Sequence, residues 1–237
     1  MLRDFLIGVL RALGILKRIK IRWLVLALIP LLFVGGYLAA KIVLRNELNK
    51  KLAAALGMEP EIGSVAPGWR WHVAENIVFR NTTTKSILLS IDRIDHDLPL
   101  WEALRGNLRP HQIILHGVNV LVELDDQGRP IGIPKPESTP SELPSDQIDV
   151  RRAQVEVRQQ GRPSIMADDI VAEILDDSGQ VRFSATVPAL LGGTWKTSGT
   201  SSLKAQTVSA TFETTSLKID SSELLQLPGV PSWDEQP

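Results

Sequence analysis

The chain has 237 residues, with 26 lysine and arginine residues against 27 aspartate and glutamate residues, and it contains no cysteine. This near-neutral balance provides no electrostatic field to attract nucleic acid, and it argues against nucleic acid as a partner. The absence of cysteine excludes disulfides, thiolate nucleophiles and cysteine-ligated metals. The length allows one sizeable hydrophobic core.

Residues 1–20 are predicted to form a cytoplasmic or interfacial amphipathic helix. They are mostly apolar, but Asp4, Arg11, Arg18 and the following Arg22 recur at helical spacing and form a narrow polar stripe. This pattern is typical of a helix lying in the plane of a membrane. A second membrane-spanning helix is disfavoured because Arg11 interrupts the apolar run.

Residues 21–44 are predicted to form a transmembrane helix. Trp23–Ala40 carries no charge, and as a helix it would extend roughly 27 Å, close to the thickness of the hydrocarbon core. Its leucine, isoleucine, valine and phenylalanine residues favour insertion by about 3–6 kcal/mol, and Pro30 is expected to kink the helix. The alternative is a secretory signal cleaved after Leu38–Ala40, which the long basic region before the apolar segment disfavours.

The basic residues flanking this segment predict its orientation. More of them precede it than follow it, and such an excess stays in the cytoplasm. We therefore expect a single-pass inner-membrane protein with a cytoplasmic N-terminus and a periplasmic C-terminal domain. Residues 45–57 are predicted to form a membrane-proximal helix, with an i, i+4 pair between Glu47 and Lys51 and a stop at Gly57. The flanking basic residues are Arg3, Arg11, Lys17, Arg18, Lys20 and Arg22 before the segment, and Lys41, Arg45, Lys50 and Lys51 after it.

From residue 58 the hydrophobic period changes to two, which indicates half-buried strands. We expect a mainly β fold, with a curved antiparallel sheet divided into β unit 1 (58–133) and β unit 2 (147–237). The proline-rich segment 134–146 is predicted to be a loop between them. The clearest alternating runs are Trp69/Trp71/Val73, Ile87/Leu89/Ile91, Val118/Val120/Val122/Leu124, Val155/Val157, Val181/Phe183/Ala185/Val187, Val208/Ala210/Phe212 and Leu217/Ile219.

Two further local patterns accompany the strands. Pro99–Gly106 is predicted to be a short helix, because proline stands early, glycine ends it, and its apolar residues share one side. Val122–Pro130 resembles Val155–Pro163, and both copies read as a strand leading into a tight turn. The loosely organised C-terminal residues PGVPSWDEQP suggest a chain cut short.

These segments together resemble the N-terminal region of the AsmA-like family, in the wider group that includes TamB and YhdP. The resemblance covers most of the chain and implies a periplasmic β-sheet folded into a long groove, anchored in the inner membrane, that carries lipid acyl chains. This chain is much shorter than usual members, so it is either a fragment or acts with partners. The resemblance rests on Ile87–Ile94, Leu98–Gly106, Ile113–Gly128, Val150–Val157 and the glycines Gly192, Gly193 and Gly199, together with the N-terminal membrane segment.

Two functions follow from this pattern. An apolar sheet face left open would hold phospholipid acyl chains and serve phospholipid transport or outer-membrane homeostasis. The alternative is a membrane-tethered β-rich scaffold that binds another envelope protein through a strand edge and carries no lipid, with a filled, sandwich-like core. Period-two alternation alone is compatible with both the groove and the sandwich.

Asp92, Asp95, His96 and Asp97 form the densest group of residues that are able to bind a metal or transfer protons. In a strand, Asp95 and Asp97 share a face while His96 points away, so a joint site would need a bend. We interpret the group as a solvated strand end. We expect no catalytic residue, cofactor or metal, and no enzyme, because no hydrolase or phosphate-binding motif is present. His72, His111 and His116 are interpreted as structural, and Asp125–Gly128 and Asp176–Gly179 as hairpin turns.

Overall fold

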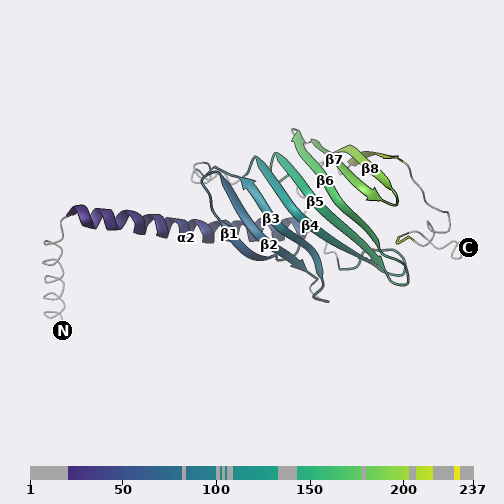
Figure 1. Ribbon diagram of the computed structural model, residues 1–237, viewed down its shortest axis with the longest axis horizontal. Coiled ribbons are helices and arrows are strands. Elements are labelled where there is room, and N and C mark those ends of the chain that lie inside the picture. Colours follow the sequence, from purple (N-terminus) through teal and green to yellow (C-terminus); the bar gives the residue numbers. More distant parts are fainter. Residues whose placement is uncertain are drawn as a thin grey trace, which may run out of the picture. The chain divides into compact units, whose positions relative to one another are not determined.

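The computed structural model describes residues 21–81, 84–99, 102, 105, 109–132, 143–177, 180–202, 207–215 and 227–229, without the side chains of residues 21–33 and 55. Within these residues one long helix, α2 (Ile21–Leu56), precedes nine strands (Figure 1). The prediction of a mainly β chain with an N-terminal helix is confirmed. The strands are β1 (Glu61–Ala66), β2 (Trp71–Arg80), β3 (Ile87–Asp97), β4 (Gln112–Leu124), β5 (Gln147–Gln159), β6 (Ile165–Asp177), β7 (Gln180–Leu190), β8 (Gly193–Ser202) and β9 (Thr207–Thr215).

The two predicted helical segments 21–44 and 45–57 lie in one continuous helix, α2. The chain divides into two compact units, Met1–Val43 and Leu44–Pro237, so the end of α2 belongs to the same unit as the sheet. Across the part of the chain that the structure describes, no helix is both long and apolar enough to cross a membrane.

Several predicted elements fall outside the described residues. They include the amphipathic helix at residues 1–20 and the side chains of the first part of the predicted span, residues 21–33. Most of the short helix at 99–106, most of the loop at 134–146 and the run Leu217/Ile219 also lie outside them. The structure therefore leaves these five predictions as they stand.

All nine strands belong to one sheet in which neighbours follow chain order. Every pair is antiparallel except β4 and β5, which run parallel and join the two predicted β units directly. The prediction of a wholly antiparallel sheet is wrong at this pair. A parallel pair needs a crossover of a dozen or more residues, and residues 125–146 between β4 and β5 supply one, whereas an antiparallel pair can be joined by a two-residue hairpin. The two copies of the internal repeat lie side by side there, with Val122 opposite Val157.

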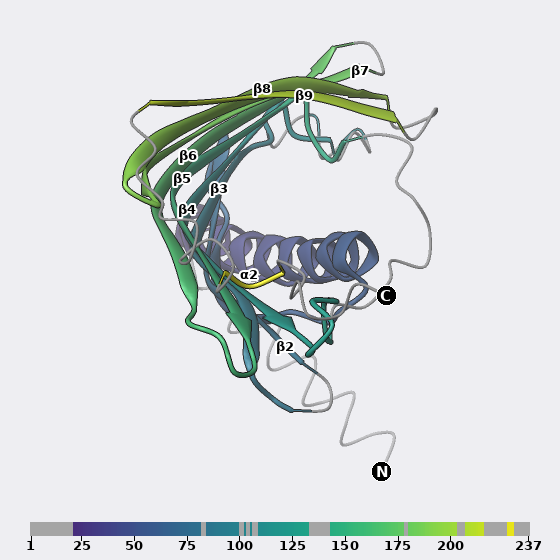
Figure 2. The same cartoon turned by 90° about the vertical axis from the view of Figure 1, so that its right-hand side faces the viewer.

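The sheet is open and curved, and it does not close into a sandwich (Figure 2). Six successive strands share the feature that bends it. In each of them, two polar or small residues separate consecutive residues of the buried face, where a regular strand places one. The extra residues are aligned from β1 to β5 and shifted by one pair on β6, where Ala167 and Ile170 lie opposite Val155 and Ala153. The strands therefore bend along one line that is stepped at β6, and the sheet curls about it. The flanking pairs are Ile62/Val65, Ala74/Ile77, Ile91/Ile94, Leu115/Val118, Val150/Ala153 and Ala167/Ile170. We call this line the crease.

Positive φ angles mark the crease at Asn76, Arg152 and Asp169 (53–55°) and at Gly117 (61°). Aspartate, asparagine and glycine tolerate this region better than β-branched residues do. At Gly117 a second constraint applies, because a Cβ atom there would overlap the Asp92 carboxylate on β3. The crease therefore requires glycine at this position.

We expect Gly117→Ala to lower the free energy of unfolding by about 1–2 kcal/mol from the left-handed backbone alone, and by more because of the overlap with Asp92. Chemical denaturation of the full chain in a mild detergent measures this loss. Adding Asp92→Ala should restore the unfolding free energy that is lost to the overlap. The loss due to the left-handed backbone should remain. If the double variant is no more stable than Gly117→Ala, the overlap is not the cause.

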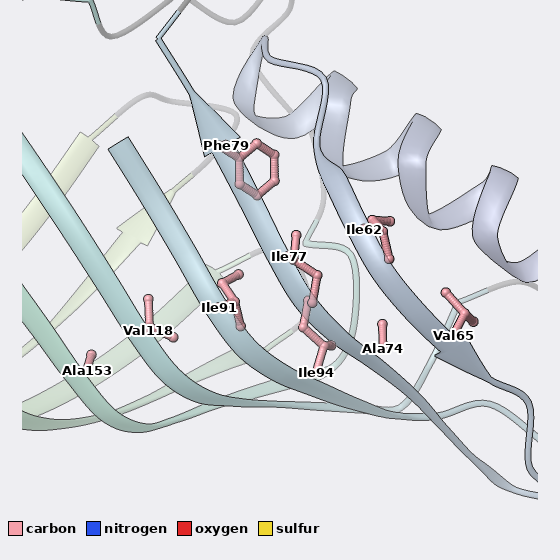
Figure 3. Packing of buried hydrophobic residues seen from close by; sticks show 9 residues of the cluster. All are labelled: Ile62, Val65, Ala74, Ile77, Phe79, Ile91, Ile94, Val118 and Ala153. Atoms are coloured by element: carbon pink, nitrogen blue, oxygen red, sulfur yellow. The ribbon is translucent and has the colours of Figure 1, made fainter. Parts of the chain in front are cut away.

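The hydrophobic core lies where the end of α2 packs on β1–β5. Leu44, Leu48, Leu52 and Leu56 recur every fourth residue along one side of the helix and pack against the buried face of the sheet. Figure 3 shows the buried residues of this cluster on their strands. Ala74, Ile77 and Phe79 have no exposed surface. The end of the helix thus supplies the second layer of a core that a single sheet cannot close.

Candidate functional site

The acidic cluster at the end of β3 is the densest group of potential ligands in the sequence. The structure divides it between two sides of the strand. Asp95 contacts Arg93 (Nε to Oδ1, 2.7 Å) and His116 (Nε2 to Oδ2, 3.1 Å), whereas His96 stacks obliquely on His72 with 5.0 Å between ring centroids. Among the described residues, no three histidine, aspartate or glutamate side chains converge to hold a metal ion.

Asp97 has a structural partner of its own. Its two carboxylate oxygens accept hydrogen bonds from Nε and Nη2 of Arg70, each at 3.0 Å, and its side chain is 6% exposed while that of Arg70 is 66% exposed. This two-point pair raises the pKa of Arg70, chiefly through the hydrogen bond with Asp97. The contact fastens the chain before β2 to the end of β3.

His72 is buried with both ring nitrogens satisfied. The Gly68 backbone N–H donates to Nδ1 at 3.1 Å, and Nε2 lies 2.8 Å from the Leu98 carbonyl oxygen. Nδ1 must therefore accept and Nε2 must carry the hydrogen, which assigns a neutral tautomer. The histidine holds two loop segments together, in agreement with its interpretation as structural.

His96 has a strongly altered acidity. Burial lowers the pKa of His96 to about 4, with smaller contributions from His72 and from Lys51 of α2, against the opposing Asp95 and Asp97 carboxylates. A histidine with this pKa is uncharged at neutral pH. It therefore behaves there as a polar member of the core.

His111 lies on the surface where the crossover segment returns to the sheet. Its Nδ1 is 3.0 Å from Oδ2 of Asp146, and this hydrogen bond is the main reason why the pKa of His111 is raised. The Gln147 backbone N–H also donates to the His111 carbonyl oxygen at 3.0 Å. These contacts align the start of β5 with the start of β4 and give His111 a structural role.

Asp125–Gly128 forms the tight turn that the sequence predicts. Oδ1 of Asp125 accepts hydrogen bonds from the backbone N–H groups of Gln127 (2.9 Å) and Arg129 (2.8 Å). The bond from Arg129 is the main cause of the lowered pKa of Asp125. These bonds are the pattern of a turn in which aspartate caps its own loop. Part of Asp176–Gly179 lies outside the described residues.

The most extensive feature with a possible ligand is the face of the sheet that α2 contacts, here called the inner face. Its residues follow the backbone register from strand to strand in continuous rows. One row crosses all nine strands through Val65, Ala74, Ile94, Leu115, Val150, Ala172, Ala185, Thr197 and Phe212. A second crosses eight strands through His72, His96, Ile113, Ile148, Ile174, Phe183, Gly199 and Ala210. Neither row contains an aspartate, glutamate, lysine or arginine residue.

The first row of the inner face becomes more exposed from β1 to β9. Along the first row Val65 is 3% exposed and Ala74 is fully buried, the residues on β4–β8 are half-buried, and Phe212 is 71% exposed. The cause is the position of the packed part of α2, whose leucines contact the core on β1–β5. Beyond it the sheet continues to curve (Figure 2).

The opposite, outer face carries the charges. Arg158 pairs with Glu156 (Nε to Oε1, 2.6 Å), and Gln112 donates to Asp149 (2.6 Å). Val171 is 54% exposed there, although its neighbour Ile170 belongs to the inner core. The sheet therefore has one polar face for water and one apolar face that water solvates poorly.

The alternation is visible in the sequence, but the strands β1, β6 and β8 and the crease were not predicted from it. A signal for the crease is present: two polar or small residues between two apolar ones, as in Ile91-Asp-Arg-Ile94, Val150-Arg-Arg-Ala153 and Ala167-Asp-Asp-Ile170. In the sequence these four-residue patterns look like breaks in a strand. Only the pairing of each strand with its neighbours shows that they are bends within continuous strands.

No protein-family model matches this chain, and no curated protein matches it significantly.

Proposed function

We propose that the inner face binds acyl chains of phospholipids, and that the chain serves phospholipid transport or outer-membrane homeostasis from an inner-membrane anchor. The observation that carries the proposal is the pair of uncharged rows crossing the sheet, which become uncovered toward β9. A contiguous apolar surface of this extent is unfavourable in water, and acyl chains would cover it without needing hydrogen-bond partners.

The proposed membrane anchor is Trp23–Ala40, supported by its uncharged, apolar sequence and by the basic residues that precede it. The resemblance to the AsmA-like family supports the same arrangement, with the sheet in the periplasm. An anchored sheet with an open apolar face would be placed next to its lipid source.

The alternative is a membrane-tethered scaffold without lipid cargo. The observation that favours it is the packing of Leu44, Leu48, Leu52 and Leu56 on the sheet, because this part of the inner face is already filled by protein. The two functions differ in what covers the inner face from β6 to β9. A lipid would contact Ile170 and Ala172 but not Val171, which is on the outer face.

Photo-crosslinking in living cells tests this difference. A benzophenone amino acid replaces Ile170 in one variant of the full chain and Val171 in another, and phospholipids carry a phosphorus-32 label. We expect a labelled adduct on irradiation from position 170 and none from position 171. Absence of an adduct at 170, in a chain present at the normal level, would contradict lipid binding and favour the scaffold.

A charge variant provides the second arm of the same experiment. We expect Ala172→Glu to reduce the adduct at position 170 at least several-fold, because a carboxylate placed against acyl chains loses its hydration. The matched control Val171→Glu puts the same charge on the outer face and should leave the adduct unchanged. Equal effects of the two variants would indicate a loss of folding and not of lipid contact.

A further inference from the structure

We propose that two copies of this chain pair through their β9 strands, antiparallel and about a two-fold axis, and form one continuous sheet. The proposal rests on the edge of the sheet and does not depend on lipid cargo. β9 is the last strand in the sheet order, and β8 is its only named neighbour among the described strands. All nine of its residues are exposed.

The two edges of the sheet differ in protection. At the β1 edge, Nη2 of Arg45 from α2 donates to the Ile62 carbonyl oxygen at 2.9 Å. β9, with the sequence TVSATFETT, contains no lysine, no proline and one charge, Glu213. Lysine, proline and bulges are among the devices that prevent edge pairing, and β9 has none of these three. Within the described part of the chain, no strand other than β8 pairs with β9, so its outer edge offers nine residues to another strand.

The sequence of β9 is complementary to itself. Around a two-fold axis through Thr211, Ala210 faces Phe212 of the partner subunit, and Ser209 faces Glu213 of the partner subunit. Phe212 and Val208 stay on the inner face of both copies, so the apolar rows continue from one copy into the other. The two Glu213 carboxylates lie apart, each opposite a serine, and no like charges are opposed.

The apolar side chains of β9 provide the driving force. Val208 is 69% and Phe212 is 71% exposed, which is high for large hydrophobic residues in a strand. The register centred on Thr211 places each phenylalanine ring against a small alanine, where it loses contact with water. The same register pairs N–H and C=O groups on the edge of β9 that have no strand partner among the described residues.

Cysteine crosslinking tests the register, because the chain has no cysteine of its own. In the full chain in mild detergent, we expect Thr211→Cys to form a disulfide-linked dimer under gentle oxidation, since each Thr211 faces its own copy. Thr207→Cys is the matched control, because the two copies of residue 207 would lie roughly 27 Å apart. An equimolar mixture of Ser209→Cys and Glu213→Cys should crosslink, while each alone should not.

Two lysine variants test the affinity of the proposed dimer. Thr211→Lys opposes two lysines at the axis and should weaken the dimer about five-fold at low salt, by mass photometry. Ser209→Lys faces Glu213 of the partner subunit and should leave the dimer unchanged or tighter. A chain that stays monomeric, or crosslinks equally at 207 and 211, overturns the proposal. Lipid capture at position 170 is scored separately, so either proposal can fail alone.

Discussion

Replacing Phe79 with alanine is expected to lower the free energy of unfolding by about 3–5 kcal/mol, the usual cost of emptying a buried phenylalanine site. Phe79 has no exposed surface and belongs to the core cluster between β2 and α2. The loss combines the transfer free energy of the ring with the cavity that it leaves. Urea denaturation of the full chain in mild detergent, followed by tryptophan fluorescence, measures it.

The matched control is Phe212→Ala, the same chemical change on the same face of the sheet. Because Phe212 is 71% exposed, its loss should change the free energy of unfolding of the monomer by no more than about 0.5 kcal/mol. Comparable losses in the two variants would show that β9 is covered as well as β2. That result would contradict the uncovered inner face on which the proposed function depends.

Acidification should destabilise the folded chain through His96. The pKa of His96 in the fold is about 4, against 6.5 for an unhindered histidine, so the unfolded chain binds this proton more readily. Stability is unaffected by this group above about pH 6.5 and falls progressively as the pH drops toward 4. The difference between the two pKa values corresponds to about 3 kcal/mol of unfolding free energy.

Urea denaturation at a series of pH values between 7 and 4 checks this expectation. The control variant His96→Gln has no titrating group at this position and should lose the part of the pH dependence due to His96. If the variant and the unaltered chain show parallel curves, then His96 is charged in the fold or reached by water. Either outcome would contradict the burial of His96, which is only 7% exposed and lies beside His72.

Part of the sheet could be predicted because its strands keep a strict period of two. Val118–Leu124 in β4, Val181–Val187 in β7 and Val208–Phe212 in β9 alternate cleanly, and all three form strands. β1 is short, β6 has Asp168 and Asp169 in its middle, and β8 is dominated by small polar residues. These three strands exist because their neighbours supply hydrogen-bond partners, which local propensity does not report.

The candidate site, too, was only partly predictable from the sequence. The acidic cluster on β3 was visible in the sequence, and so was the geometric reason why it does not converge, because adjacent residues of a strand face opposite ways. The inner face was visible only as separate alternating runs. Their order in space, and the gradient from a buried Ala74 to an exposed Phe212, required the strand register and the position of α2.

The sequence by itself determined that the chain is mainly β after Gly57, that its strands have one apolar face, and that an uncharged segment precedes them. These properties are local, since they depend on side-chain period and composition. Only the tertiary structure decided that β4 and β5 pair in parallel, that the bends of β1–β5 align into a crease that is stepped at β6, and that the end of α2 covers part of the inner face. Strand pairing and packing join residues that are far apart in the chain, and no local sequence pattern specifies which distant segments pair.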